Sequence, residues 1–253
     1  MGDRLDLPPF FSLTAFDEVD STSIQAKRLA EEGVPSGQLV VANSQNGGVG
    51  RRGRAWSSPA GNLYCSLMIR PNCSSHEAAK LSFLIAVALY HAVRPLLPAD
   101  VSVNLKWPND VLVDGKKIAG ILLESKSKSD GNLEWLVIGT GVNLKHFPEV
   151  TEGLPATSML ENGAVVDPAD MLNRYADQFL KYYMEWQQNG FAPIRDEWLN
   201  YAKGIGGPVV ARLPNAELSG IFKGLSTDGA LILQQNDETI KEISAGEVFF
   251  PED

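Results

Sequence analysis

The sequence is poor in cysteine and histidine and has no excess of positive charge. Two cysteines and three histidines among 253 residues provide no metal-ligand spacing and no disulfide framework, which suits a reducing compartment. Thirty-one acidic side chains against 22 basic ones give a net charge of −9, which argues against a general affinity for DNA or RNA. We therefore expect neither a disulfide-stapled secreted scaffold nor a basic nucleic-acid-binding domain.

The pattern also lacks a secretion signal and a membrane-spanning run. Residues 1–13 have no basic start followed by an apolar stretch, and the longest apolar run, residues 83–93, is too short to span a bilayer. The hydrophobic content of 44% is ordinary for a globular chain. We expect a cytoplasmic protein with no membrane partner.

Local patterns predict a mixed α/β domain of residues 1–203 followed by a small β-barrel of residues 204–253. Strands are expected at 13–19, 38–42, 62–70, 101–107 and 134–144, and helices at 24–33, 76–97, 167–190 and 193–203. Asp114-Gly115 between apolar runs predicts a type I′ hairpin over 110–125. Four short β runs separated by turn residues predict the barrel.

Residues 44–62 contain a glycine-arginine loop in which residues 48–53 read G-x-G-x-x-G. A dinucleotide fingerprint needs a helix that starts within the glycines, but Pro59 and Gly61 leave no room for one. An RNA-binding arginine loop is disfavoured by the charge of −9. Flexible glycines together with three guanidinium groups favour a loop that closes over an anionic ligand.

A second group of polar side chains surrounds the predicted hairpin: Lys106, Asn109, Asp110, Lys116 and Lys117. A proline between Lys106 and Asn109 fixes the turn that directs Asn109 and Asp110 to a common point. Because side chains alternate along a strand, one of the two adjacent lysines has to point inward. We expect Lys116 at the surface, whereas the pattern leaves the direction of Lys117 open.

Five motifs follow one another in an order that resembles the biotin protein ligases. They read FDEVDSTS, GRRGRAWSSPAGNLYCSL, KWPND, KKIAGILLE and GTGVN, and the predicted barrel comes after them. The resemblance covers nearly the whole chain. It implies a mixed β-sheet flanked by helices, in the class II synthetase-like biotin/lipoate ligase fold, with a C-terminal SH3-like barrel. It also implies the short class, which lacks an N-terminal helix-turn-helix domain.

The resemblance implies a set of site residues. Biotin would bind to Ser21, Thr22, Ser23, Gln45, Val49, Gly50, Arg51, Lys117 and Gly120. ATP would bind to Arg51, Arg52, Arg54, Trp56, Asn109, Asp110, Lys117 and Asn143. Lys117, Arg51 and Asp110 would be catalytic, and Mg²⁺ would accompany ATP through ligands that the motifs do not identify. Two departures stand out, since the family usually has arginine at the position of Val49 and often asparagine at that of Ser23.

The activity that the resemblance implies has two steps. Biotin and ATP form biotinyl-5′-AMP, and the biotinyl group then passes to a lysine of a biotin carboxyl carrier domain. A lipoate or octanoate ligase on the same fold is the enzymatic alternative, and a non-catalytic biotin- or nucleic-acid-binding module is the other. We expect no DNA partner. A homodimer and the identity of the carrier remain open.

Overall fold

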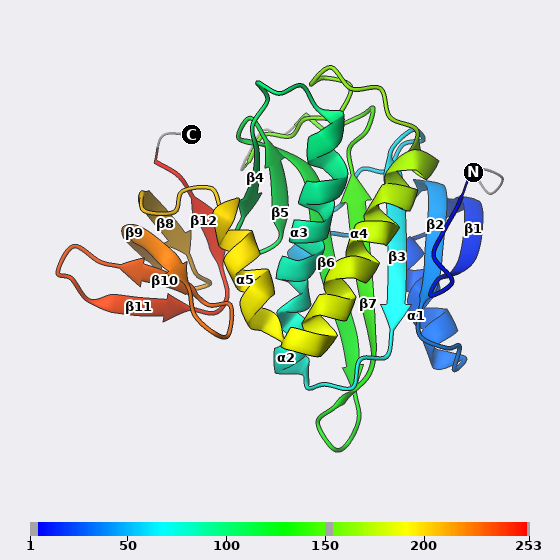
Figure 1. The fold of residues 1–253 in the computed structure, drawn as a ribbon, viewed down its shortest axis with the longest axis horizontal. Helices are drawn as coiled ribbons and strands as arrows, with labels where there is room; N and C mark the ends of the chain where they lie inside the picture. Colours follow the sequence, from blue (N-terminus) through cyan, green and yellow to red (C-terminus); the bar gives the residue numbers. More distant parts are fainter. Residues whose placement is uncertain (1–4, 150–153, 252–253) are drawn as a thin grey trace.

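The computed structural model describes residues 5–149 and 154–251, and its larger β-sheet has seven strands (Figure 1). They are β1 (Ser12–Val19), β2 (Gln38–Gln45), β3 (Leu63–Ile69), β4 (Val103–Lys106), β5 (Asp110–Val113), β6 (Lys116–Ser127) and β7 (Leu133–Val142). Their order is β1-β2-β3-β7-β6-β5-β4, with β1 and β2 parallel and the other neighbours antiparallel. The predicted mixed sheet is confirmed.

Helices cover both faces of this sheet. Helix α1 (Thr22–Glu31) packs on one face, whereas α3 (Leu81–Val93), α4 (Pro168–Asn189) and α5 (Phe191–Asn200) lie on the other (Figure 1). Alternation within one strand separates the two cores. In β2, for example, Val40 packs with α1, while Leu39 and Val41 belong to the larger core on the opposite face.

Helix α3 is the buried centre of the larger core. Eleven of its 13 residues are buried, which explains why the sequence there is apolar almost all round. The expected single helix over 76–97 is divided into α2 (Ser75–Ala79), α3 and a 3₁₀ turn (Arg94–Leu96), with the first break at Lys80. By length and composition alone, Ser75–Leu96 is apolar enough to cross a membrane, but 67% of its apolar window is buried inside this fold.

The hairpin that carries the predicted site forms as expected. Asp114 and Gly115 have φ values of 45° and 76°, the left-handed conformations that a type I′ turn requires. Strand β5 therefore pairs directly with β6, and Lys106 at the end of β4 faces Asp110 at the start of β5. The hairpin thus brings Lys106 and Asp110 close to Lys117 at the start of β6.

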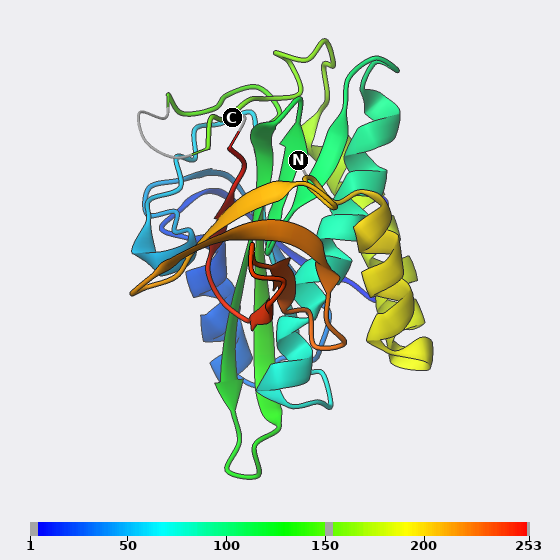
Figure 2. The ribbon, with the colours of Figure 1, turned by 90° about the vertical axis from the view of Figure 1, so that its left-hand side faces the viewer.

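The C-terminal sheet has five antiparallel strands rather than the four predicted. They are β8 (Pro208–Arg212), β9 (Glu217–Leu225), β10 (Leu231–Gln234), β11 (Ile240–Ile243) and β12 (Glu247–Phe249), in the order β11-β10-β9-β8-β12. Figure 2 shows this sheet in front of the edge of the larger one. The indole N–H of Trp107 donates to the carbonyl of Gly229 over 3.1 Å, which fixes the two sheets to each other.

Candidate active site

A cavity of about 300 Å³ opens between the larger sheet, the glycine-arginine loop and the edge of the C-terminal sheet. All of the predicted biotin and ATP residues line it except Arg52. Among the described residues, four cationic side chains and two carboxylates contribute to its wall: Arg51, Arg54, Lys106, Lys117, Asp110 and Glu247. The positive side chains gather toward one end, so the cavity has a neutral end and a cationic end.

The neutral end is a network of hydroxyl and amide groups on α1, β2 and β3. The Gln45 side-chain oxygen accepts from the Thr22 backbone N–H over 2.8 Å, and its amide donates to the Ser58 hydroxyl over 2.9 Å. The hydroxyls of Thr22 and Ser23 both lie within 3.0 Å of the Ser66 hydroxyl. Because both ends of its amide are engaged, Gln45 is held in one orientation, which suits recognition of a polar uncharged group.

The floor between the two ends is made of glycine. Gly120 on β6 faces Gly141 on β7, and the Trp56 ring lies over both of them. A Cβ at Gly141 would come within 2.7 Å of the Trp56 ring, and one at Gly139 within 2.8 Å of the Ser23 hydroxyl. The buried indole N–H of Trp56 meets no hydrogen-bond acceptor in the part of the chain that the structure describes. A flat ring therefore packs on this floor only because the strands carry no side chains there.

Lys117 points inward, which resolves the alternative that the sequence left open. Its ammonium group lies 2.5 Å from an Asp110 oxygen and 5.5 Å from the centre of the Trp56 ring, and its side chain is 26% exposed. Lys116 is exposed, as predicted. The backbone of Lys117 donates to Pro155 and accepts from Thr157, so residues 155–157 pair with the start of β6. Lys117 thus presents its cation at the middle of the cavity.

Arg51 and Lys106 make the cationic end. The Arg51 guanidinium donates to the Asn109 side-chain oxygen over 3.1 Å, and Asn109 in turn donates to the Ile121 carbonyl over 2.6 Å. Burial lowers the pKa of Lys106, and the nearby charges of Lys117 and Arg51 lower it further, although Asp110 opposes them. Burial likewise lowers the pKa of Arg51. Because the described part of the wall has four cationic side chains and two carboxylates, positive charge is in excess there, which suits an anionic ligand.

Arg52 is the one predicted residue that does not line the cavity. Its backbone is left-handed, with φ at 57°, and its guanidinium lies 3.6 Å from a Glu247 oxygen. Arg54 pairs with the same carboxylate. The loop as a whole is closed on itself, because Gly50 donates to the Arg54 carbonyl and Trp56 to that of Gly48.

Among the cavity residues that the sequence did not predict are Glu247 and Phe249, because β12 was not predicted. The run that contains them, EVFF, is short, and its strand pairs with β8 over a long sequence separation. The sequence also did not predict the role of Asn62, whose side-chain oxygen accepts from the backbone N–H groups of Leu144, Lys145 and His146. Asn62 therefore shapes the segment that follows β7.

Asn143 has a structural role that the motif did not reveal. Its side-chain amide donates to the Thr157 carbonyl over 3.0 Å, and its backbone carbonyl accepts from Met159 over 2.9 Å. Through these bonds Asn143 holds the segment after residue 153 against β6. This segment contributes to the cavity wall through Leu154 and Ala156.

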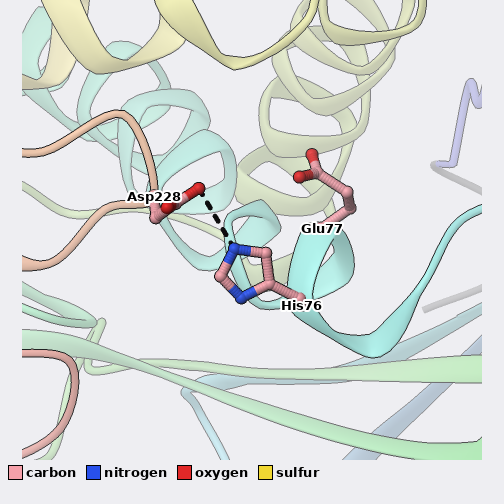
Figure 3. A group of neighbouring side chains, drawn as sticks. All are labelled: His76, Glu77 and Asp228. Carbon is pink, nitrogen blue, oxygen red and sulfur yellow. Dashed lines mark ion pairs between the residues drawn. The ribbon is translucent and has the colours of Figure 1, made fainter.

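A second polar cluster lies outside the cavity, where α2 meets the C-terminal sheet. Figure 3 shows His76, Glu77 and Asp228 grouped there, with His76 3.1 Å from Asp228. Lys80 lies 2.7 Å from Glu77 and 3.0 Å from Asp228. Because an ammonium group already occupies the centre of the cluster, we interpret it as an ion-pair contact between the two sheets and not as a metal site.

The fold and this cavity define a ligase class, and comparisons with known proteins agree. The chain belongs to the Biotin/lipoate A/B protein ligase family, whose sequence model matches residues 15–143. The Biotin protein ligase C terminal domain matches residues 204–250, which supports the biotin branch of that family. The resemblance drawn from the five motifs and the predicted fold class are both confirmed.

Individual relatives point the same way. The chain is 42% identical to the biotin–[acetyl-CoA-carboxylase] ligase of Paracoccus denitrificans, over 91% of this chain and 97% of that protein. It is 34% identical to the bifunctional ligase/repressor of Bacillus subtilis, over 92% of this chain but 72% of that protein. The structure of the Aquifex aeolicus biotin protein ligase in complex with biotin and ATP is similar, with a TM-score of 0.79 at 28% identity, covering 94% and 97% of the two chains.

Proposed function

We propose that this protein activates biotin with ATP to biotinyl-5′-AMP and transfers the biotinyl group to a lysine of a biotin carboxyl carrier domain. The observation that carries the proposal is a single cavity with two chemically different ends that meet at Lys117. A neutral hydrogen-bonding end fits the uncharged rings of biotin. A cationic end fits the triphosphate of ATP.

Biotin binding is assigned to the neutral end. The fixed Gln45 amide and the hydroxyls of Ser21, Thr22 and Ser23 offer donors and acceptors to the ureido group. Gly120 lets the Trp56 ring pack flat against the floor beside the biotin rings, and Val49 and Gly50 border the cavity from the loop. This orientation directs the biotin carboxylate toward Lys117 and Arg51.

In the first half-reaction a carboxylate oxygen of biotin forms a bond to the α-phosphorus, and the bond from that phosphorus to the bridging oxygen breaks to release pyrophosphate. Two like charges about 4 Å apart repel by roughly 4 kcal/mol at an effective dielectric of 20. Lys117 and Arg51 offset this repulsion and hold the charge that spreads over the phosphoryl oxygens. Arg52, Arg54 and Trp56 are assigned to the rest of the nucleotide.

The cationic end of the cavity also has an oxygen donor that could hold Mg²⁺. Asp110 has its carboxylate at the cavity wall, between Lys117 at 2.5 Å and Lys106 at 3.9 Å. One carboxylate together with phosphate oxygens is a common Mg²⁺ environment, so Asp110 fits the ion as the protein's donor. Mg²⁺ bound with ATP would neutralise charge on the departing pyrophosphate.

In the second half-reaction the carrier lysine amine attacks the carbonyl carbon of biotinyl-5′-AMP. A C–N bond forms, the bond to the phosphate oxygen breaks, and AMP leaves with the electron pair. Asp110 is assigned to orient the incoming amine and to accept its proton. No covalent enzyme nucleophile is required.

Biotin-dependent exchange of labelled pyrophosphate into ATP tests the activity directly. We expect exchange with biotin and none with lipoate as the control acid. Exchange with lipoate in place of biotin would favour the lipoate alternative. Absence of exchange with either acid, in a protein that binds biotin, would favour the non-catalytic module.

The partners follow from the same proposal. We propose a cytoplasmic enzyme that meets its carrier transiently and does not bind a DNA operator. Sub-micromolar binding to an operator duplex at physiological salt would contradict the DNA part, because a surface of net charge −9 offers no general attraction to phosphate.

A further inference from the structure

Strand β12 connects the C-terminal sheet to the glycine-arginine loop. It is an edge strand that pairs only with β8, and Glu247 and Phe249 alternate with Val248 along it. Val248 is buried in the C-terminal sheet, whereas Glu247 and Phe249 face the cavity. Alternation in a three-residue strand therefore directs a carboxylate out of one sheet and toward the loop that covers the other.

Glu247 receives two guanidinium groups from that loop. Arg54 pairs with it directly, and Arg52 lies 3.6 Å from the same oxygen. The Glu247 side chain is 19% exposed, whereas those of Arg52 and Arg54 are 47% and 62% exposed. Two cations on one carboxylate leave a net positive charge at the cavity wall.

Stability alone does not account for this arrangement. Ion pairs between exposed side chains contribute little to the free energy of unfolding. Arg52 moreover holds a left-handed backbone, which is uncommon for a residue other than glycine. Arginine has five donors, so a guanidinium that is held by Glu247 still has donors left for a phosphate.

We propose that Glu247 is a positioning residue of the nucleotide site, which holds Arg52 and Arg54 ready for the triphosphate. The inference rests on the proposed function. Without the carboxylate, both arginine side chains return to free rotation, and ATP has to order them when it binds. The neutral end of the cavity does not depend on this contact.

The test is the KM for ATP in the biotin-dependent exchange reaction of the full chain. For Glu247→Ala we expect a KM for ATP roughly tenfold higher, with kcat and the Kd of biotin measured without ATP changed by about twofold or less. Glu247→Asp keeps the charge and should recover most of the affinity. Glu247→Gln keeps an acceptor but no charge and should fall between them.

Two matched controls separate positioning from general packing. Asp228→Asn weakens another ion pair of the C-terminal sheet, the one that its β9–β10 turn makes with Lys80 at the junction of α2 and α3, without touching the loop. Glu217→Gln removes a carboxylate that pairs with Arg212 within the C-terminal sheet. Both controls should keep the wild-type KM for ATP, and all variants should keep the wild-type Tm.

An unchanged or lower KM for ATP in Glu247→Ala would overturn the proposal. An unchanged KM would mean that the carboxylate does not affect ATP binding, and a lower KM would mean that it competes with ATP for the two arginines. An equal rise in Asp228→Asn would also overturn it, in favour of a general contact between sheets. These outcomes presuppose a wild-type protein with biotin-dependent exchange. If the wild type lacked that activity, the proposed function would fail instead, so the two failures are distinguishable.

Discussion

The two ends of the cavity are built on different principles. The neutral end stands on regular elements, α1, β2 and β3, and its hydroxyls and amide are hydrogen-bonded to one another. The cationic end stands on a loop, a hairpin and the edge of the C-terminal sheet. There, Lys106 and Lys117 flank the half-buried carboxylate of Asp110, Arg51 bonds to the neighbouring Asn109, and burial lowers the pKa of Lys106 and Arg51.

This difference shows how one cavity can bind a neutral ring system and also bring two anionic groups, a carboxylate and a phosphate, close together. A satisfied polar network is rigid and gives selectivity without unbalanced charge. A cluster of under-compensated cations is costly in the empty protein, and anionic ligands relieve that cost. Substitutions at the cationic end should therefore act on catalysis and nucleotide affinity, whereas those at the neutral end and on the floor should act on biotin affinity.

The largest expected effect comes from removing the cation where the two ends meet. Lys117→Ala should reduce biotin-dependent exchange by about 10²–10³-fold, the range found when one preorganised donor to a developing charge is lost. The Tm should stay near that of the wild type, because the side chain is 26% exposed and fills no core space. The adjacent Lys116→Ala is the matched control and should remain fully active. Near-normal exchange in Lys117→Ala would remove this lysine from the mechanism.

The glycine floor gives the next largest effect, this time on biotin. In Gly141→Ala the new methyl group would lie 2.7 Å from the Trp56 ring and would displace it. Overpacking of this kind costs about 1–3 kcal/mol, so biotin affinity should fall roughly tenfold or more. Gly207→Ala, where the nearest atom is 3.4 Å away, is the control. Unchanged biotin affinity by calorimetry in Gly141→Ala would show that the indole moves aside freely.

Val49 tests how firmly the loop closes. Val49 borders the cavity and is 48% exposed, so it offers apolar contact where the family usually has a guanidinium. In Val49→Arg a new charge-assisted hydrogen bond worth about 1.5–3 kcal/mol should slow dissociation of biotinyl-5′-AMP by roughly tenfold or more. Hydrogen exchange of residues 46–54 should also slow further when biotin is added. Equal dissociation rates in the two proteins would show that position 49 acts only through its backbone.

Substitution of Lys106 should give the smallest effect, and it should raise stability while lowering affinity for ATP. Because burial lowers its pKa, the charged form of Lys106 costs stability at neutral pH, and this cost declines as pH rises above the folded-state pKa and is gone above the ordinary lysine pKa of 10.5. Lys106→Met should therefore raise the Tm of the ligand-free protein, by about 2–4 °C for each kcal/mol relieved, while weakening ATP binding. The gain in Tm should shrink toward alkaline pH. A constant gain across that range would assign it to packing instead of charge.

The sequence predicted those parts of the fold whose signals are local. Asp114-Gly115 specified the hairpin, Gly190 ended α4, and the apolar run around Leu84 specified a buried helix, because each depends on neighbouring residues alone. The direction of Lys117 needed the strand's register, which alternation limits to two choices and tertiary packing decides.

The sequence did not predict contacts between residues that lie far apart along the chain. Glu247 enters the site because β12 pairs with β8, and a three-residue run carries too weak a pattern to predict. The resemblance placed Arg52 at the nucleotide, but Arg52 does not line the cavity itself and lies behind the wall residue Glu247, with a left-handed backbone. Asn62 looked like an ordinary strand neighbour, yet it binds three backbone N–H groups some 80 residues further along the chain.

The central claim is that one cavity joins a neutral site for the biotin rings to a cationic site for its carboxylate. Comparing biotin with biotinol, whose carboxylate is replaced by a neutral hydroxymethyl group, tests it most directly. We predict that Lys117→Ala weakens biotin binding but leaves the Kd of biotinol at the wild-type value. An equal loss of affinity for both compounds would contradict the division of the cavity into two ends.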